Sequence, residues 1–360
     1  MKIPFSPPDV GEDELKEIGE ALASGWITTG PRTKEFEKEI VSYCGSDMAV
    51  CLNSQTACAE MALRALGVGK NDEVITSAYT YTASASVACH VGAKLALVDT
   101  AENSFEMDYE KLADSITENT KVVIPVDIGG VPCDYDKIFD IVESKKSLFK
   151  PSNDIQAAYG RVIVMADTAH SFGASYKGVK TGDVADISNF SFHAVKNLTT
   201  AEGGAGVWKK HEGVDLDEIY HYMQLLSLHG QSKDALAKTQ KGSWEYDVMF
   251  PGYKCNMTDI AAAMGLSQLK KYDALLARRK EIIKKYDSIL APLGITGLNH
   301  YTNEHVSSGH LYICRVPNIG LDDRSEIINK MEDEGVSCNV HYKPLPMLTA
   351  YKDMGFKIND

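Results

Sequence analysis

One lysine, Lys196, occurs in a stretch of small and hydroxylated residues between two apolar segments of the chain. Residues 187–192 before it run apolar or alternate like a buried strand, and residues 203–208 after it read as a short apolar strand that begins with two glycines. A lysine in such a loop can be desolvated, which lowers its pKa. A free amine can then attack a carbonyl group and form a Schiff base. The alternative is a solvated lysine on a hairpin, which is the commoner situation of this residue type.

The totals favour a globular protein with a large and a smaller domain, because 360 residues exceed what one simple core needs. The net charge of −13 argues against nucleic acid as a partner, although one local pocket can still be positive and hold a phosphorylated small molecule. The eight cysteines occur singly without Cys-x-x-Cys, so we expect reduced thiols and no metal. No long apolar run and no signal core are present, and we therefore predict a cytoplasmic location without membrane contact.

Strand-like and helix-like segments alternate from about residue 48 to 208, which is typical of an α/β domain with a mainly parallel sheet. Residues 48–52 form a short apolar strand, followed by a polar turn at 53–57 and a helix to about Leu66. This layout points backbone N–H groups at an anion, although an ordinary helix cap fits it equally well. The turn lacks the glycine-rich dinucleotide fingerprint, so a Rossmann cofactor is not supported.

A strong buried strand at residues 162–167 ends in a carboxylate, Asp167. An acid at the carboxyl end of a parallel strand faces the crevice where α/β proteins bind ligands, and the alternative for Asp167 is a helix N-cap. Further along, the apolar spacing predicts one continuous helix from Asp259 to Leu290. A β-α-β unit is predicted after it. Its segments are residues 310–316, 322–334 and 336–342.

The stretch from Ser191 to Gly204 reads SFHAVKNLTTAEGG and resembles the signature of the DegT/DnrJ family of pyridoxal-phosphate (PLP) enzymes, the nucleotide-sugar aminotransferases. In that family the lysine matched by Lys196 carries PLP as an internal aldimine. The resemblance implies fold type I, the aspartate aminotransferase architecture. That fold has a large α/β domain, with a mainly parallel sheet of the seven-stranded type flanked by helices, and a smaller α+β C-terminal domain. We place the large domain at residues 1–250 and the smaller one at 251–360.

The same resemblance implies roles for further residues. They are phosphate binding by Thr56, Ala57 and Ser191, stacking on the pyridine ring by Tyr81, pairing with the ring nitrogen by Asp167, and a place near the ring oxygen for His170. Tyr79 is a competing candidate for the stacking residue. Two positions depart from the family pattern. Gln55 replaces a common glycine in the phosphate turn, and Asp127 stands where many relatives carry histidine.

Residues 252–259 read GYKCNMTD and resemble the family segment whose asparagine reaches the PLP phosphate of the neighbouring subunit. Asn256 is the candidate for that contact and Lys254 is the alternative, whereas Thr258 also suits a helix N-cap. The resemblance therefore implies a homodimer with shared active sites. The chain ends earlier than most relatives, which leaves a missing final helix or a truncated end as open alternatives.

The resulting prediction is a PLP-dependent aminotransferase that converts a nucleotide-linked 4-keto (6-deoxy) sugar to the 4-amino sugar. Glutamate is the expected amino donor, and the route passes through the pyridoxamine form of the cofactor (PMP). One alternative is a non-catalytic sugar-nucleotide sensor with the same fold. Another is a PLP-dependent sugar dehydratase, against which Lys196 argues because those relatives carry histidine there. The nucleotide, the sugar and the stereochemistry of amination do not follow from the sequence.

Overall fold

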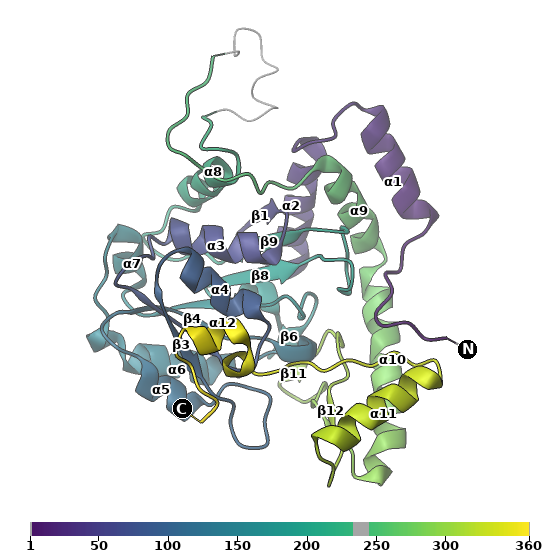
Figure 1. Cartoon of the computed structure of the whole chain (residues 1–360). Helices are drawn as coiled ribbons and strands as arrows, with labels where there is room; N and C mark the ends of the chain where they lie inside the picture. Colours follow the sequence, from purple (N-terminus) through teal and green to yellow (C-terminus); the bar gives the residue numbers. More distant parts are fainter. Residues whose placement is uncertain (1, 233–244, 360) are drawn as a thin grey trace.

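The computed structural model describes residues 2–232 and 245–359, and a seven-stranded sheet forms the centre of this part (Figure 1). The strands are β1 (Met48–Leu52), β2 (Glu73–Ser77), β3 (Lys94–Val98), β4 (Thr120–Ile124), β5 (Ile163–Asp167), β8 (Ile187–Ser191) and β9 (Gly204–Trp208). Their order across the sheet is β1-β9-β8-β5-β4-β2-β3. The strands from β8 to β3 pair in parallel, and β9 pairs antiparallel with both β1 and β8. The predicted α/β class with a mainly parallel sheet is thereby confirmed.

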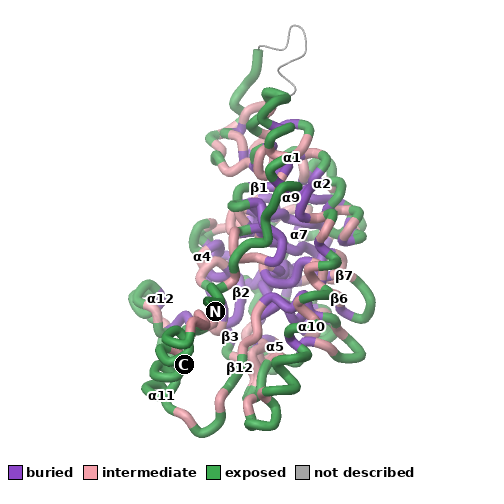
Figure 2. Tube along the Cα trace, turned by 90° about the vertical axis from the view of Figure 1, so that its right-hand side faces the viewer, coloured by how far each residue is buried: buried purple, intermediate pink, exposed green. Residues whose placement is uncertain are grey.

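Both faces of the sheet are covered, as the side-chain alternation of β5 illustrates. Ile163 and Met165 pack into one apolar cluster, together with helices α3 (Gln55–Ala65), α4 (Thr82–His90) and α8 (Leu216–Ser227). Val164 and Ala166 pack into the opposite cluster with α5 (Tyr109–Ser115) and α6 (Tyr135–Ser144). Successive residues of a strand point to opposite faces, so a strand buried on both sides reads as a continuous apolar run. Figure 2 shows the buried residues concentrated along this central layer.

Helices α1 (Glu12–Ala23), α2 (Pro31–Cys44) and α9 (Asp259–Lys270) pack together beside the β1 edge of the sheet (Figure 1). The fully buried Asp259 carboxylate accepts hydrogen bonds from the backbone N–H groups of Gly30 and Thr33 and from the Thr33 hydroxyl. A carboxylate at a helix N-terminus satisfies N–H groups that have no partner inside the helix. Asp259 therefore joins the start of α9 to the start of α2.

The single helix predicted from Asp259 to Leu290 is wrong in one respect, because the structure contains two helices. Helix α9 ends at Lys270, and α10 (Tyr272–Leu290) begins after Lys271, whose φ of −105° and ψ of 3° leave the helical region. Tertiary contacts hold the break. The Lys271 Nζ atom lies 3.0 Å from the Glu14 carboxylate, and the buried Tyr272 hydroxyl donates to the Phe172 carbonyl at 2.7 Å. Apolar spacing alone does not register such contacts.

The C-terminal β-α-β prediction is confirmed only for its helix, α11 (Leu321–Asp333). The strand expected at 310–316 is reduced to β12 (Cys314–Arg315), which pairs with β10 (Thr296–Gly297). The strand expected at 336–342 is wrong, since these residues form only an isolated bridge between Val336 and Ile3. A strand requires a neighbouring ladder, and this segment lies beside single residues of other elements instead.

The end of the described chain returns to the sheet. Leu345 and Tyr351, the latter in α12 (Thr349–Asp353), are buried in the same apolar cluster as α3 and α4. Figure 1 accordingly shows α12 close to α4. Helix α11 by contrast buries no residue and is exposed in Figure 2. The division of the chain near residue 250 stays a prediction.

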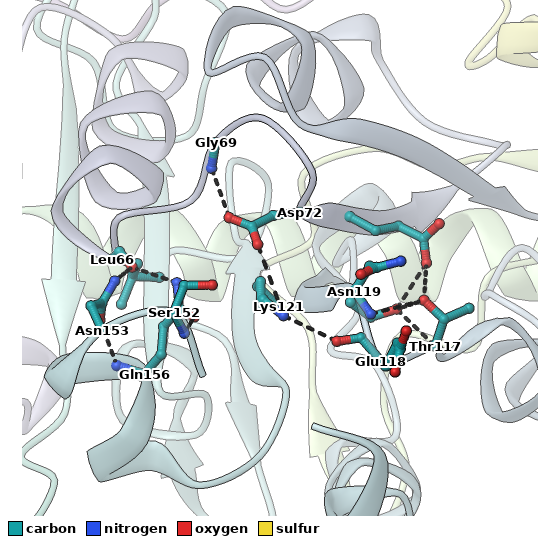
Figure 3. Close-up of polar contacts among 12 residues, drawn as sticks. Leu66, Gly69, Asp72, Thr117, Glu118, Asn119, Lys121, Ser152, Asn153 and Gln156 are labelled. Carbon is teal, nitrogen blue, oxygen red and sulfur yellow. Dashed lines mark hydrogen bonds and ion pairs between the residues drawn. The ribbon is translucent and has the colours of Figure 1, made fainter. Parts of the chain in front are cut away.

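Residues 145–160 are not merely a polar excursion on the surface, as the sequence had suggested. They contain α7 (Asp154–Tyr159), in which Gln156 and Tyr159 are buried. The side-chain amides of Asn153 and Gln156 donate to the Leu66 carbonyl at the end of α3, at 3.0 and 2.9 Å (Figure 3). Since these bonds satisfy carbonyl groups at a helix terminus, the segment closes the end of α3.

A buried lysine, Lys121, lies near the amino ends of β2 and β4 (Figure 3). Its Nζ atom donates to the Glu118 carbonyl at 3.1 Å and lies 3.8 Å from the Asp72 carboxylate. Asp72 in turn accepts from the Gly69 N–H at 2.9 Å. Burial lowers the pKa of Lys121. These contacts fasten the loops at the edge of the sheet where β2 and β4 begin.

The remaining short elements complete the outline. They are η1 (Ile128–Gly130), η2 (Lys146–Leu148), η3 (Thr181–Asp183), η5 (Ala291–Leu293), η6 (Leu345–Met347) and a three-stranded sheet of β11 (His305–Val306), β6 (Ser175–Tyr176) and β7 (Val179–Lys180). Within the described residues, no helix has the length and apolar character that crossing a bilayer requires.

Candidate active site

A cavity of about 430 Å³ opens at the carboxyl ends of the parallel strands, within the size range of small-molecule sites. This is the edge where α/β sheets place their ligands, because several strand-to-helix loops converge there. Six of the residues predicted from the sequence line the cavity. They are Thr56, Tyr81, Asp167, His170, Ser191 and Lys196. Ala57 and Asn256 are not among the lining residues.

Lys196 lies in the loop between β8 and β9, as the sequence predicted, and is half-buried. The loop is held at both ends, because the Phe192 N–H donates to the Gly203 carbonyl and the Thr200 N–H to the Phe192 carbonyl, both at 2.8 Å. Burial lowers the pKa of Lys196 to about 8, against an opposing effect of the Asp167 carboxylate. A substantial fraction of the amine is therefore unprotonated near neutral pH, as a nucleophile requires.

Asp167 is the last residue of β5 and is 5% exposed. The Ser84 hydroxyl donates to its Oδ2 atom at 2.6 Å, and the Ala169 N–H donates to Oδ1 at 3.1 Å. Burial raises the pKa of this carboxyl group. In the described part of the chain no cationic side chain forms an ion pair with Asp167, so a buried carboxylate faces the cavity without a counter-charge. Burying a carboxylate in this way is costly unless a cationic or hydrogen-bonding partner is bound.

The start of α3 forms another wall of the cavity. Ser54 is the N-cap, and its hydroxyl accepts from the Ala57 N–H at 3.1 Å, which accounts for the absence of Ala57 from the lining. Gln55 is the first helical residue and does not require a positive φ, so the missing family glycine causes no strain. Thr56 and Ser54 add hydroxyl groups at the helix N-terminus, where N–H groups and the helix dipole favour an anion.

The second glycine before β9, Gly204, explains the two glycines of the lysine motif. A Cβ atom at Gly204 would lie 2.4 Å from the Gln55 backbone nitrogen and 2.5 Å from the Ser54 carbonyl carbon. At Gly203 a Cβ atom would lie 2.2 Å from the Thr200 hydroxyl. The motif thus lets β9 approach the start of α3, which brings the lysine loop and the candidate anion site together.

The structure separates the two candidate stacking tyrosines. Tyr81 lines the cavity and is 61% exposed. Tyr79 does not line it, and its hydroxyl instead accepts from the Tyr342 N–H at 2.9 Å and donates to the His341 carbonyl. Tyr79 therefore fastens the segment that carries His341 and Tyr342, both of which are cavity residues.

His170 is buried between two partners on its two ring nitrogens. The Gly129 N–H donates to Nδ1 at 3.2 Å, and the Tyr342 hydroxyl lies 3.2 Å from Nε2. The ring also packs against that of His310, with 4.4 Å between centroids. Burial lowers the pKa of His170 well below its usual range. His170 is consequently a neutral imidazole at physiological pH.

Asp127, the other departure from the family pattern, lies beneath this histidine and is fully buried. Its Oδ2 atom accepts from the Ser171 hydroxyl at 2.6 Å, and its Oδ1 atom accepts from the Cys133 N–H and the Tyr135 hydroxyl, both at 2.9 Å. One carboxylate therefore joins the turn after β4 to the turn after β5. Burial raises the pKa of Asp127 to about 6.

The N-terminal segment reaches the same cavity, which the sequence did not reveal. The Ser6 hydroxyl donates to the Val195 carbonyl at 2.8 Å, next to Lys196. The Phe5 ring stacks on His341 with 5.6 Å between centroids. These contacts join the lysine loop to the segment around residue 341, across positions that no local pattern relates.

Asn256 lies away from the cavity lining. Its amide nitrogen donates to the Thr29 hydroxyl at 2.6 Å, and its amide oxygen accepts from the Lys254 ammonium. Thr258 caps α9 by accepting from the Ala261 N–H. The predicted helix start is thus present, and the predicted contact of Asn256 with a neighbouring subunit stays a prediction.

Three residues of the site were missed as such: Ser84, His341 and Tyr342. The V-H-Y-x-P-L segment at residues 340–345 was the available signal for the last two, because the family carries it. Ser84 has no sequence signal, since its bond to Asp167 spans 83 positions.

Comparison with known proteins gives a consistent result. The model of the DegT/DnrJ/EryC1/StrS aminotransferase family matches residues 8–359. A similar solved structure is the PMP-form of Spr1654 from Streptococcus pneumoniae, assigned as a sugar aminotransferase. It is 53% identical with a TM-score of 0.96 over 99% of this chain and 90% of that one.

Two further relatives extend the comparison. The spore coat polysaccharide biosynthesis protein SpsC of Bacillus subtilis (strain 168) is 38% identical over 365 residues, which is 99% of this chain and 88% of that protein. Helicobacter pylori PseC, an aminotransferase involved in the biosynthesis of pseudoaminic acid, is 27% identical with a TM-score of 0.84. That match covers 100% of this chain and 89% of PseC.

Proposed function

Since the chain belongs to the DegT/DnrJ/EryC1/StrS aminotransferase family and is a PLP-dependent sugar aminotransferase, we propose that it converts a nucleotide-linked 4-keto sugar to the 4-amino sugar with glutamate as donor. The observation that carries the proposal is the pairing of Lys196 with Asp167 across one cavity. The first is an amine with a lowered pKa and the second a buried carboxylate without a cationic partner.

The residues present fit PLP. The Asp167 carboxylate suits a protonated pyridine nitrogen, because such a partner would supply the charge that its burial lacks. The N-terminus of α3 with Ser54 and Thr56, together with Ser191, suits the phosphate group. Tyr81 offers an aromatic face at the cavity wall for ring stacking. Bound PLP supplies an aldehyde that reacts with amines and a ring that accepts electrons.

Within this arrangement each side chain has a defined task. Lys196 Nζ binds the cofactor and, once the amino donor has displaced it, takes a proton from the donor's α-carbon. Its pKa of about 8 suits both the uptake and the return of that proton near neutral pH. Asp167 holds a proton on the ring nitrogen, and the Ser84 hydroxyl keeps the carboxylate oriented.

The sugar assignment is supported by the relatives. SpsC is named for spore coat polysaccharide biosynthesis and PseC for the biosynthesis of pseudoaminic acid, and both therefore serve amino-sugar or polysaccharide formation. We propose the same kind of role for this chain, with the amine placed at carbon 4 of a 6-deoxy hexose.

We further propose that the chain acts as a homodimer whose copies share their active sites. Support comes from exposed apolar side chains close to Asn256, with Val248 50% and Met249 61% exposed. Because Asn256 does not line the cavity of its own chain, its proposed phosphate contact would be made to the partner copy.

The test is the visible spectrum of the purified protein with PLP, before and after addition of glutamate. The wild type should show a visible band from cofactor bound to Lys196, and glutamate should bleach it while one 2-oxoglutarate forms per site. Lys196→Ala should show neither the band nor product, whereas Lys38→Ala, an exposed lysine on α2, should behave as wild type. A visible band and full turnover in Lys196→Ala would refute the mechanism.

The acceptor is tested separately on the glutamate-treated enzyme. A panel of nucleotide-linked 4-keto-6-deoxy hexoses should restore the visible band, and the corresponding 3-keto isomers should not. Restoration by the 3-keto isomers alone would refute the position of amination while leaving the cofactor assignment intact.

A further inference from the structure

The His170–Tyr342 pair carries an inference beyond the proposed assignments. The sequence placed His170 near the ring oxygen of PLP, but the structure places the Tyr342 hydroxyl 3.2 Å from its Nε2 atom. The two rings are nearly parallel, with an angle of 13° between their planes. Both residues line the cavity. The nitrogen expected to meet a ligand therefore already has a partner within the chain.

The direction of the hydrogen bonds follows from the other nitrogen of the ring. A backbone N–H can only donate, so the Gly129 N–H at 3.2 Å requires Nδ1 to accept and to carry no proton. A neutral imidazole then has its proton on Nε2. Nε2–H consequently donates to the Tyr342 oxygen, and the hydroxyl proton of Tyr342 remains available for a different acceptor.

That proton has its free acceptor space in the cavity. No other hydrogen bond of the Tyr342 hydroxyl occurs within residues 2–232 and 245–359. Burial raises the pKa of Tyr342, so the hydroxyl stays protonated at physiological pH. The donor is also fixed in place, because the Tyr79 hydroxyl bonds the Tyr342 N–H and the neighbouring His341 carbonyl.

The position of the pair identifies the acceptor. Both Asp167 and Lys196 are near enough to act electrostatically on the pair, Asp167 on Tyr342 and Lys196 on His170. In PLP the ring hydroxyl is attached to the carbon next to the one that bears the aldehyde, on the ring edge between that carbon and the nitrogen. A donor beside both Asp167 and Lys196 therefore faces the ring oxygen.

We propose, on the basis of the PLP site proposed above, that Tyr342 rather than His170 donates a hydrogen bond to the ring oxygen of PLP. His170 and Tyr79 are positioning residues in this arrangement. His170 orients the hydroxyl by occupying its lone pair, and Tyr79 holds the backbone of Tyr342.

The test is a comparison of PLP with its analogue that carries hydrogen in place of the ring hydroxyl. Dissociation constants of both are measured from absorbance and fluorescence titrations of the wild type and Tyr342→Phe. The variant should lose roughly 2- to 10-fold in affinity for PLP relative to wild type, the usual net effect of one neutral hydrogen bond, and nothing for the analogue. Tyr79→Phe should give a smaller loss with the same selectivity for PLP.

Tyr286→Phe is the matched control, because it removes a tyrosine hydroxyl from α10 outside the cavity. Equal losses for PLP and the analogue in Tyr342→Phe, or no loss for either, would overturn the proposal. A wild type that forms no visible band with PLP would instead refute the proposed function itself, so the two failures are distinguishable.

Discussion

Asp127→Asn should remove a pH-dependent destabilisation of the native state. The Asp127 carboxyl group is fully buried, and its pKa rises from 3.8 to about 6 on burial. The native state therefore binds more protons than the unfolded state between about pH 4 and 6, and the free energy of unfolding falls as the pH rises through this window. At about 1.4 kcal/mol per pH unit, ionisation costs the native state about 3 kcal/mol by pH 7.

Asparagine resembles the protonated acid in shape and charge. Its amide oxygen can still accept from the Cys133 N–H and the Tyr135 hydroxyl, and its NH₂ group can donate to the Ser171 oxygen, so each hydrogen-bonded position keeps a partner. The stability of the variant relative to wild type should accordingly increase by about 3 kcal/mol between pH 4 and 7.

The measurement is urea unfolding at fixed protein concentration from pH 4 to 8, since dimerisation makes stability concentration-dependent. Subtracting the wild-type curve cancels the other titrating groups. Asp140→Asn, an exposed carboxyl on α6, gives the effect of removing a surface charge. Parallel curves for wild type and Asp127→Asn, or a variant that loses stability as the pH rises, would refute the reasoning.

Two further predictions concern the lysine loop. The rate at which PLP forms its visible band should rise about tenfold per pH unit below pH 8 and level off above it, because the Lys196 amine has a pKa of about 8 and only its free form attacks; stopped-flow absorbance measures this, and a rate that still climbs steeply above pH 9 contradicts it. Gly204→Ala should destabilise the protein by about 1–3 kcal/mol and weaken PLP binding, since its Cβ would lie 2.4 Å from the Gln55 nitrogen. Urea unfolding and PLP titration check this against Gly19→Ala, where no atom lies within 4 Å, and equal effects would contradict it.

Features within short segments could be read from the sequence. The lysine loop and the strand that ends at Asp167 followed from apolar patterns five to six residues long, because a strand buried on both faces is apolar throughout. The Ser84–Asp167 and His170–Tyr342 bonds join residues 83 and 172 positions apart, and no local pattern reports them.

The failures have the same physical origin. The break at Lys271 depends on contacts with Glu14 and on the bond between the Tyr272 hydroxyl and Phe172, whereas the apolar spacing continues across it. The missing strand at 336–342 depends on whether a neighbouring ladder exists. Both outcomes are decided by which distant segments meet.

The burial of Lys121 makes one end of the sheet accessible to chemical footprinting. Its side chain is 4% exposed, whereas that of Lys94, at the start of the neighbouring β3, is 75% exposed. An amine-acylating reagent will therefore modify Lys94 at once and Lys121 only after the Asp72 contact has opened. The ratio of the two acylated peptides over time is a clock for local unfolding at this edge, independent of the cofactor and of turnover.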